Sequence, residues 1–240
     1  MFSDYDAFAR MYDRHWGKNT IARLPLVREL VLSRLAPGAK ILDLCCGTGQ
    51  VAHALTCDGF VVTGVDGSSE ALTLARRNAP DAQFLHADAR TLDLPREYDA
   101  VLSLFDSLNH VLTLPDLSAV FRNVRTALRD DGVFLFDLNT ENKYRTTWTG
   151  SFAIVEDDLV GAFRGGANFD EKIATFDAAL FEKQASGAWR RANVHLRQTW
   201  YAETEVLCAL ETAGFSHVTV HCPDGPDKLY FHASGSGSRE

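Results

Sequence analysis

Short apolar runs alternate with amphipathic segments along the chain from about residue 39. The apolar runs predict strands, and the amphipathic segments predict helices. Strand-like runs occupy residues 40–45, 60–65, 83–86, 99–104 and 132–138, and helix-like segments occupy residues 50–57, 68–78 and 116–129. This alternation is typical of βαβ units on a parallel sheet, which binds its ligands at the carboxyl ends of the strands.

Different patterns flank this region. Residues 5–35 predict helix, which ends at the stop signal "APG". Residues 151–200 lack a helical period and contain two alternating runs, "KIATFDAALFEKQ" and "AWRRANVHLRQTW", separated by "ASG". These runs predict a hairpin within a small antiparallel sheet. A helix at 202–213 and strands near 215–222 and 228–232 follow.

The patterns divide the chain into an α/β domain with additions. We expect an N-terminal helical cap at 1–38, the α/β domain at 39–145 and 201–233, an antiparallel β insertion at 146–200 and a disordered tail at 234–240. The insertion follows the fifth parallel strand. It would therefore lie over the carboxyl edge of the sheet, as a lid on a substrate site.

Composition excludes several classes of protein. The net charge of −8 and the lack of a Lys/Arg cluster longer than a pair argue against a nucleic-acid partner. No apolar run approaches the ~20 residues of a membrane span. Five cysteines, two of them the adjacent Cys45 and Cys46, fit neither a disulfide framework nor a metal site. We expect a cytoplasmic monomer or homodimer that binds no metal, nucleic acid or membrane.

The stretch "ILDLCCGTGQ", residues 41–50, joins a strand to a glycine turn. Gly47 and Gly49 let backbone N–H groups approach a ligand, and the following helix offers its positive end. "GTGQVA" also matches the dinucleotide pattern G-x-G-x-x-A, with Asp66 at a suitable distance for a ribose contact. A nicotinamide-dependent oxidoreductase and a turn that binds nothing are therefore alternatives.

Three acidic residues at successive strand ends favour a different ligand. Asp43 precedes the turn, where it would repel phosphates but attract an ammonium group. Asp66 can accept hydrogen bonds from ribose hydroxyls, and Asp88 can accept one from an adenine amino group. Ammonium, ribose and adenine together describe S-adenosylmethionine.

Five motifs in order resemble those of class I S-adenosylmethionine-dependent methyltransferases: "ILDLCCGTGQ", "VTGVDGS", "FLHADARTL", "YDAVLSLFDSLNHV" and "LRDDGVFLFDLNT". The resemblance covers about residues 39–140. The stretch "AFARMYDRHWGK" and the late insertion resemble a subgroup of small bacterial enzymes that includes the N-methyltransferases of nucleotide-linked amino sugars. This family implies a Rossmann-like sheet of order 3-2-1-4-5-7-6 with the seventh strand antiparallel.

The resemblance also implies a set of cofactor contacts. These lie at the ends of the first four strands and comprise Asp43, Cys45, Gly47, Thr48, Gly49, Asp66, Gly67, Asp88, Ala89, Phe105 and Asp106. Asp43 would be tolerated in an apolar strand because it lies near the strand end and places the methionine ammonium.

The segment "LFDSLNHV" lies beside the transferred methyl group in this family, so its polar residues are candidates for catalysis. His110 titrates near neutrality and is the preferred general base; alternatively, it packs against the following helix. Asp106 and Asn109 would orient the cofactor or acceptor, or begin the helix. Phe105 would stack near the cofactor, or pack in the core.

Aromatic residues of the N-terminal helix provide a second group of candidates. Tyr12 matches a tyrosine that reaches the active site in the amino-sugar N-methyltransferases, and Tyr5 is a second possibility. Core packing is the alternative for both. In "NVHLRQTW", His195 and Arg197 share one strand face, where they would bind an anionic substrate or meet solvent.

The acceptor remains open at this stage. The "DPPY"-type sequence of enzymes that methylate amide or base nitrogens is missing, and "FDSL" stands in its place. We therefore predict methyl transfer to a nitrogen or oxygen of a small molecule. The alternatives are an NAD-dependent oxidoreductase and a cofactor-binding module without transfer activity.

Overall fold

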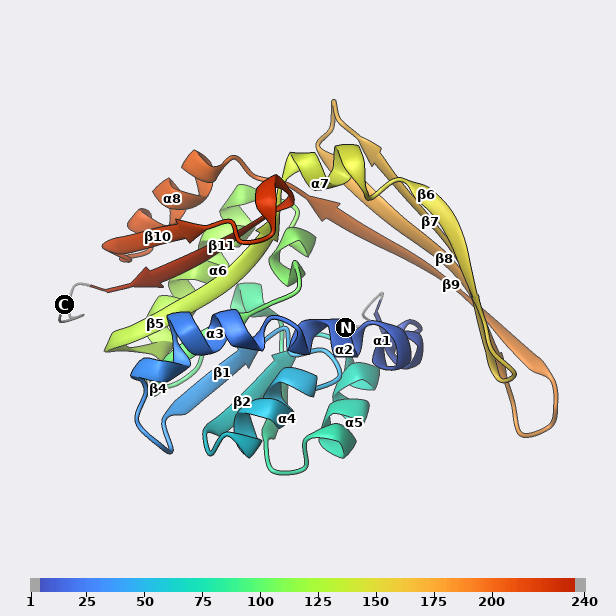
Figure 1. Cartoon of the computed structure of the whole chain (residues 1–240), viewed down its shortest axis with the longest axis horizontal. Coiled ribbons are helices and arrows are strands. Elements are labelled where there is room, and N and C mark those ends of the chain that lie inside the picture. Colours follow the sequence, from blue (N-terminus) through green and yellow to red (C-terminus); the bar gives the residue numbers. More distant parts are fainter. Residues whose placement is uncertain (1–4, 236–240) are drawn as a thin grey trace.

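A seven-stranded sheet forms the body of the computed structural model, which describes residues 5–235 (Figure 1). The strand order is β3-β2-β1-β4-β5-β11-β10. The strands are β1 (Lys40–Leu44), β2 (Val61–Asp66), β3 (Gln83–His86), β4 (Tyr98–Ser103), β5 (Leu128–Asn139), β10 (His217–His221) and β11 (Lys228–Ser234). Strands β1 to β5 pair in parallel, and β11 pairs antiparallel to both β5 and β10. The expected order and its antiparallel strand are confirmed.

Helices cover both faces of this sheet. The α-helices are α1 (Ala9–His15), α2 (Gly17–Ile21), α3 (Leu24–Leu30), α4 (Gln50–Cys57), α5 (Ser69–Asn78), α6 (Leu114–Ala127), α7 (Glu141–Thr146) and α8 (Glu203–Thr212). One apolar cluster joins α6 and α8 to the sheet through Phe134 and Phe136 of β5. A second cluster joins α3 and α4 to the sheet through Leu135. Because neighbouring residues of a strand point to opposite faces, these clusters lie on opposite sides of the sheet.

The insertion forms a separate four-stranded antiparallel sheet. Its strands are β6 (Gly150–Val155), β7 (Leu159–Asn168), β8 (Ile173–Lys183) and β9 (Trp189–Thr199), in the order β6-β7-β8-β9. The predicted hairpin is β8–β9. We call these strands the insertion sheet; Figure 1 shows that it extends away from the body, with α1 between the two.

Helix α1 is attached to both neighbours. On one side, the Asp13 carboxylate accepts hydrogen bonds from the Gln50 amide at 2.7 Å and the Asn78 amide at 2.8 Å, both from helices of the body. On the other side, Arg10 and Arg14 form ion pairs with Asp158 of the insertion, at 2.5 and 2.7 Å. A third apolar cluster fills the same interface and comprises Phe8, Met11, Leu159, Phe163, Ala178, Leu180, Val194 and Leu196.

The C-terminus differs from the expected tail. Ser234 is the last residue of β11 and is buried, because it pairs with Val133 of β5. The rest of the expected tail from residue 236 lies outside the described residues. Among residues 5–235, no helix combines the length and apolarity needed to span a bilayer.

Candidate active site

The glycine turn connects β1 to α4 at the carboxyl edge of the sheet. Gly47 and Gly49 both have left-handed backbones, with φ of 54° and 84°. A Cβ atom on Gly49 would lie 3.0 Å from Ala75 of α5, so glycine is required there for packing as well as for conformation. The Asp66 carboxylate accepts hydrogen bonds from the N–H groups of Gly47 and Ser68, both at 2.8 Å. Asp66 therefore joins the turn to the end of β2.

Asp43 is a buried acid without a complete set of partners. The residue is 3% exposed, and its Oδ2 atom has no hydrogen-bond partner among the described residues. Burial, together with the nearby Asp66 carboxylate, raises the pKa of Asp43 to about 7. A buried carboxylate of this kind is stabilised by a cation. The site therefore fits a ligand with an ammonium group, as the methionine part of S-adenosylmethionine has.

The Asp88 carboxylate already has hydrogen-bond partners within the protein, which the sequence did not suggest. The Arg90 guanidinium donates to both of its oxygens, at 2.5 to 3.1 Å, and the Arg90 N–H donates to Oδ1 at 2.9 Å. These contacts lower the pKa of Asp88, with the Arg90 side chain as the main cause. An adenine amino group would therefore share this carboxylate with Arg90.

The other expected cofactor contacts near the glycine turn and the ends of β2 and β3 differ in how exposed they are. Cys45, Gly67 and Ala89 follow β1, β2 and β3 at the carboxyl edge, and each is at least partly exposed. Thr48 is completely buried, and its hydroxyl donates to Gln50 at 2.8 Å. Neither its side chain nor its backbone is exposed, so the structure offers no ligand contact at Thr48.

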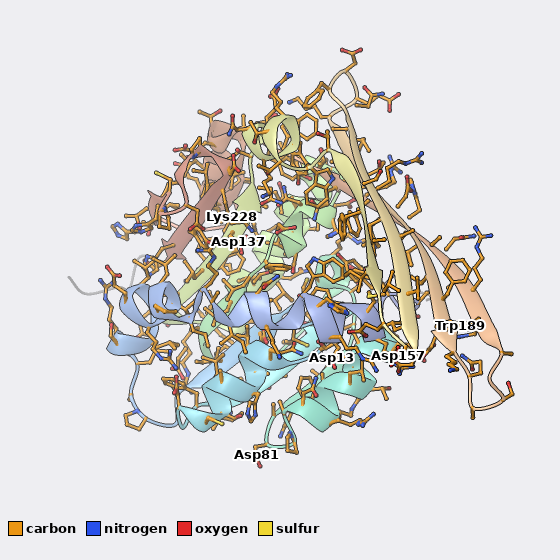
Figure 2. The ribbon with its side chains drawn as sticks, turned by 45° about the vertical axis from the view of Figure 1, so that its right-hand side comes forward. Asp13, Asp81, Asp137, Asp157, Trp189 and Lys228 are labelled. Carbon is orange, nitrogen blue, oxygen red and sulfur yellow. The ribbon has the colours of Figure 1, made fainter. Side chains whose placement is uncertain are left out.

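The segment after β4 begins with an unusual turn. Phe105 and Asp106 are consecutive residues with positive φ, 65° and 52°. Their N–H groups donate to the two carboxylate oxygens of Asp137, at 2.6 and 2.9 Å. The Lys228 ammonium forms ion pairs with Asp106, at 2.9 Å, and with Asp137. Figure 2 shows Lys228 and Asp137 side by side between β11 and β5.

His110 lies at the end of a short 3₁₀ helix, Ser107–His110, and meets residues from two other parts of the chain. Its Nδ1 atom is 2.7 Å from the carbonyl oxygen of Arg197. Because a carbonyl only accepts hydrogen bonds, Nδ1 carries a proton, and the lone pair of the neutral ring is on Nε2. The Tyr5 hydroxyl lies 2.8 Å from Nε2 and the Gln198 amide nitrogen lies 3.0 Å from it.

Gln198 connects the insertion sheet to this corner. Its amide donates to the Asp106 carboxylate at 2.8 Å, and its oxygen accepts from the Tyr144 hydroxyl at 2.8 Å. The side chain is 3% exposed, so both contacts are shielded from solvent. We refer to Tyr5, Asp106, His110 and Gln198 as the acceptor corner.

Tyr12 lies between the glycine turn and the acceptor corner. A Cβ atom on Gly47 would lie 3.4 Å from the Tyr12 ring. The ring centroid is 6.2 Å from that of Phe105 and 6.5 Å from that of Tyr5. Burial raises the pKa of the Tyr12 hydroxyl, which therefore stays protonated at neutral pH. The two N-terminal tyrosines and the segment after β4 thus meet in one place.

Asn109 does not face this place. It is completely buried, and its amide donates to the backbone carbonyls of Asn139 at 3.1 Å and Thr199 at 2.7 Å. Its oxygen accepts from the Asn139 N–H at 2.9 Å. These three bonds join the ends of β5 and β9, so the structure gives Asn109 a structural role instead of the expected substrate contact.

His195 and Arg197 are also away from the acceptor corner. Both are exposed and alternate along β9 with Leu196 and Gln198, which are buried. His195 Nδ1 is 2.6 Å from the Asp177 carboxylate on the outer face of the insertion sheet. The expected substrate contacts of these two side chains are therefore corrected, because the opposite face of the strand meets the site. Arg197 contributes only its carbonyl oxygen.

Sequence analysis missed three residues of the site: Asp137, Gln198 and Lys228. Asp137 had a usable signal, because it is a lone acid at the end of the apolar run "VFLFDLN", as Asp43 is in "ILDL". The sequence held no such signal for Gln198 or Lys228, since a single polar residue at a strand end is common on protein surfaces. Among the described residues, no group of three or more His, Cys, Asp or Glu side chains is arranged to hold a metal.

Comparisons with known proteins agree with this geometry. Residues 41–132 match a family model described as a methyltransferase domain. YqeM of Bacillus subtilis (strain 168), whose name assigns it to the methyltransferases and states no acceptor, is 30% identical over 97% of both chains. A dTDP-3-amino-3,4,6-trideoxy-alpha-D-glucopyranose N,N-dimethyltransferase of Streptomyces venezuelae is 31% identical over 54% of this chain and 56% of its own.

A solved structure shares the fold over nearly all of the chain. It is S-adenosylmethionine-bound CalS10, an amino pentose methyltransferase from Micromonospora echinaspora. The TM-score is 0.72 at 21% identity, and the match covers 98% of both chains. The insertion sheet and N-terminal helices thus belong to the shared architecture.

Proposed function

Because the chain belongs to the S-adenosylmethionine-dependent methyltransferases, we propose that it methylates an amine nitrogen of a small molecule at the acceptor corner. The observation that carries this proposal is the contact between the Tyr5 hydroxyl and the unprotonated Nε2 of His110, beside the Asp106 carboxylate. This arrangement provides both attraction for a cationic amine and a place for its proton.

The cofactor would be held at the carboxyl ends of β1 and β2. S-adenosylmethionine would supply a methyl group on a sulfonium, whose sulfur departs as a neutral thioether and is therefore a good leaving group. Asp43 would accept from the methionine ammonium, and Asp66 would accept from the ribose hydroxyls while it keeps the glycine turn in place. The remaining task of the protein is to align the acceptor and exclude water. Tyr12 would cover the glycine turn for this purpose.

Proton removal follows from the hydrogen bonds of His110. An ammonium acceptor gives a proton to the Tyr5 oxygen while Tyr5 passes its own proton to Nε2 of His110. The neutral amine then has a lone pair for attack on the methyl carbon. The Gln198 amide nitrogen, 3.0 Å from Nε2, shares the single lone pair of that nitrogen with the Tyr5 hydroxyl, which favours the neutral ring before the acceptor binds. General-base catalysis of this kind contributes ~10²–10⁴-fold to a rate.

The choice of nitrogen over oxygen rests on charge. Asp43, Asp66 and Asp106 all lie close enough to act electrostatically on Tyr12. Lys228 balances Asp106, but the remaining negative charge attracts a cationic amine and not a neutral hydroxyl. The Streptomyces venezuelae relative carries N,N-dimethyltransferase in its name, which supports the same choice. The nicotinamide alternative is not favoured, because the matched family is one of methyltransferases.

We also propose that residues 146–200 act as a lid on the acceptor and that residues 1–38 act as a cap. The end of β9 supplies the carbonyl of Arg197 and the amide of Gln198 to the acceptor corner. Residues 39–145 and 201–233 would then hold the cofactor. Movement of the insertion sheet would open the corner without disturbing Asp43 or Asp66.

The proposal is tested by turnover with S-adenosylmethionine and a panel of amines, with the matching alcohols as controls. We expect S-adenosylhomocysteine release with amines and none with the alcohols. Turnover of alcohols alone would overturn the nitrogen assignment. In a thermal-shift assay, S-adenosylhomocysteine should raise Tm while NAD should not, because a ligand stabilises only a protein that binds it.

A further inference from the structure

The turn at Phe105–Asp106 is held in a conformation that its own residues disfavour. Both residues have positive φ, 65° and 52°, where side chains other than glycine are strained. Neither residue is a glycine, and the two are consecutive. Such a turn persists only when its surroundings fix it, so the contacts around it identify what holds it.

The Asp137 carboxylate provides that restraint. Its two oxygens accept one hydrogen bond each from the N–H groups of Phe105 and Asp106, at 2.6 and 2.9 Å. Asp137 is 1% exposed and lies within the buried C-terminal part of β5, which runs from Phe134 to Asn139. Two N–H groups that point at one carboxylate fix the orientation of both peptide units.

Lys228 balances the charge of this carboxylate from the neighbouring strand. It pairs with Asn139 in the antiparallel ladder, two positions along from the pair of Tyr230 and Asp137, so the side chains of Lys228 and Asp137 point to the same face. Its ammonium contacts Asp137 and reaches Asp106 at 2.9 Å. The Lys228 side chain is 14% exposed, and Figure 2 shows it directed toward Asp137.

The pair is not needed to join the strands. β5 and β11 share a ladder of paired residues from Lys228 opposite Asn139 to Ser234 opposite Val133. The apolar side chains of Phe136 and Phe231 stack across it with ring centroids 5.0 Å apart. The contacts particular to Asp137 are therefore those to the turn.

We propose that Asp137 and Lys228 are positioning residues for methyl transfer, which hold the Phe105–Asp106 turn and thereby place Asp106 and His110 at the acceptor corner. This proposal rests on the proposed function for the meaning of the corner, but the restraint itself is independent of turnover. Neither residue touches the reacting atoms in the proposal; each acts through the turn.

The first test is hydrogen–deuterium exchange of the protein without acceptor, comparing wild type with Asp137→Asn. An asparagine presents one acceptor and one donor, so at least one of the two N–H groups loses its partner. We expect the amides of residues 105 and 106 to exchange at least tenfold faster, while those of β5 and β11 change less than twofold. Because no turnover is needed, failure of the proposed function would not affect this result.

Asp99→Asn is the matched control. Asp99 lies at the other end of the β4 region, accepts a hydrogen bond from the Lys40 N–H at 2.7 Å and pairs with Arg129. It therefore has the same kinds of partners as Asp137 but no contact with the turn. Exchange at residues 105 and 106 should equal wild type in this variant. Equal acceleration in both variants would overturn the proposal.

Kinetics provide the second test, with Lys228→Met as the second variant if Asp137→Asn folds poorly. Either substitution should lower kcat about tenfold to a hundredfold, since a small displacement of a catalytic group strongly reduces the rate. S-adenosylhomocysteine affinity should stay within about fivefold, because Asp43 and Asp66 are untouched. Wild-type kcat in a folded variant would refute the positioning role. So would exchange that rises across the whole sheet together with a lower Tm.

Discussion

Asp43→Asn should change the pH dependence of cofactor binding. In the free protein, burial and the Asp66 carboxylate raise the pKa of Asp43 to about 7. An ammonium ligand binds to the ionised carboxylate, so binding at lower pH first requires loss of a proton. Asparagine has no such proton and has the same shape. The comparison therefore isolates the charge of one side chain.

The size of the effect follows from the titration. With a pKa of about 7, roughly a tenth of Asp43 is ionised at pH 6 and roughly nine tenths at pH 8. Affinity of wild type for S-adenosylhomocysteine should then fall about tenfold from pH 8 to pH 6, or about 1.4 kcal/mol. The Asp43→Asn protein should bind more weakly at pH 8, and its affinity should lack this decrease.

The same pKa shift predicts that, without ligand, the Asp43→Asn protein is more stable than wild type at high pH. The folded-state pKa lies above the ordinary value of 3.8, so the folded state binds the proton more tightly than the unfolded state does. This group therefore stabilises the protein at low pH, and that contribution is lost as the pH rises through about 7. Three pKa units correspond to about 4 kcal/mol as an upper bound. The Asp43→Asn protein should unfold at a higher temperature than wild type at pH 8.

Isothermal titration calorimetry at pH 6, 7 and 8 measures the affinity, and thermal unfolding at the same pH values measures stability. Every other titrating group is common to both proteins, so their difference reports the charge of Asp43 together with its coupling to Asp66. If wild type and Asp43→Asn show the same pH dependence, the carboxylate does not meet the ammonium. A lower Tm for the ligand-free variant at pH 8 would refute the view of Asp43 as a buried, uncompensated charge.

Three further variants examine other parts of the site. His110→Ala should lower kcat ~10²–10⁴-fold while S-adenosylhomocysteine affinity stays within about threefold; calorimetry and turnover together decide, and wild-type kcat would exclude His110 as the base. Asp66→Ala should weaken S-adenosylhomocysteine binding by about 1.5–3 kcal/mol, since charged hydrogen bonds are lost; unchanged calorimetric affinity would sink the ribose contact. Arg10→Met should raise the acceptor KM about two- to fivefold by removing exposed ion pairs to the insertion, and 0.5 M salt should have a similar effect on wild type. A KM that responds to neither change would show that these ion pairs do not affect the lid.

Local patterns were sufficient for the body of the fold. Each parallel strand is a separate apolar run, and the acids at 43 and 66 stand where such runs meet turns. Because strand ends of a parallel sheet lie on one edge, the sequence order of Asp43 and Asp66 already predicts their proximity. The hairpin of the insertion was also predicted from a local pattern, because its two alternating runs adjoin a short turn.

Distant contacts were beyond the reach of these patterns. Lys228 meets Asp137 from 91 positions away, and no periodicity indicates which strands will be neighbours. Alternation along β9 correctly assigned Arg197 and Gln198 to opposite faces of the strand. It carries no information on which of the two faces meets the body. Arg90 is two residues from Asp88, but the sequence could not distinguish an ion pair from a ligand contact.

Helix α1 is bonded to the body through Asp13 and to the insertion through Arg10 and Arg14. The body and the insertion sheet are therefore both bound to α1, and their relative position depends on this helix. A chimera that imports only a foreign insertion sheet would lose its match to this helix. Exchange of acceptor preference among relatives should thus require the insertion and the N-terminal helix to be transplanted as a single unit.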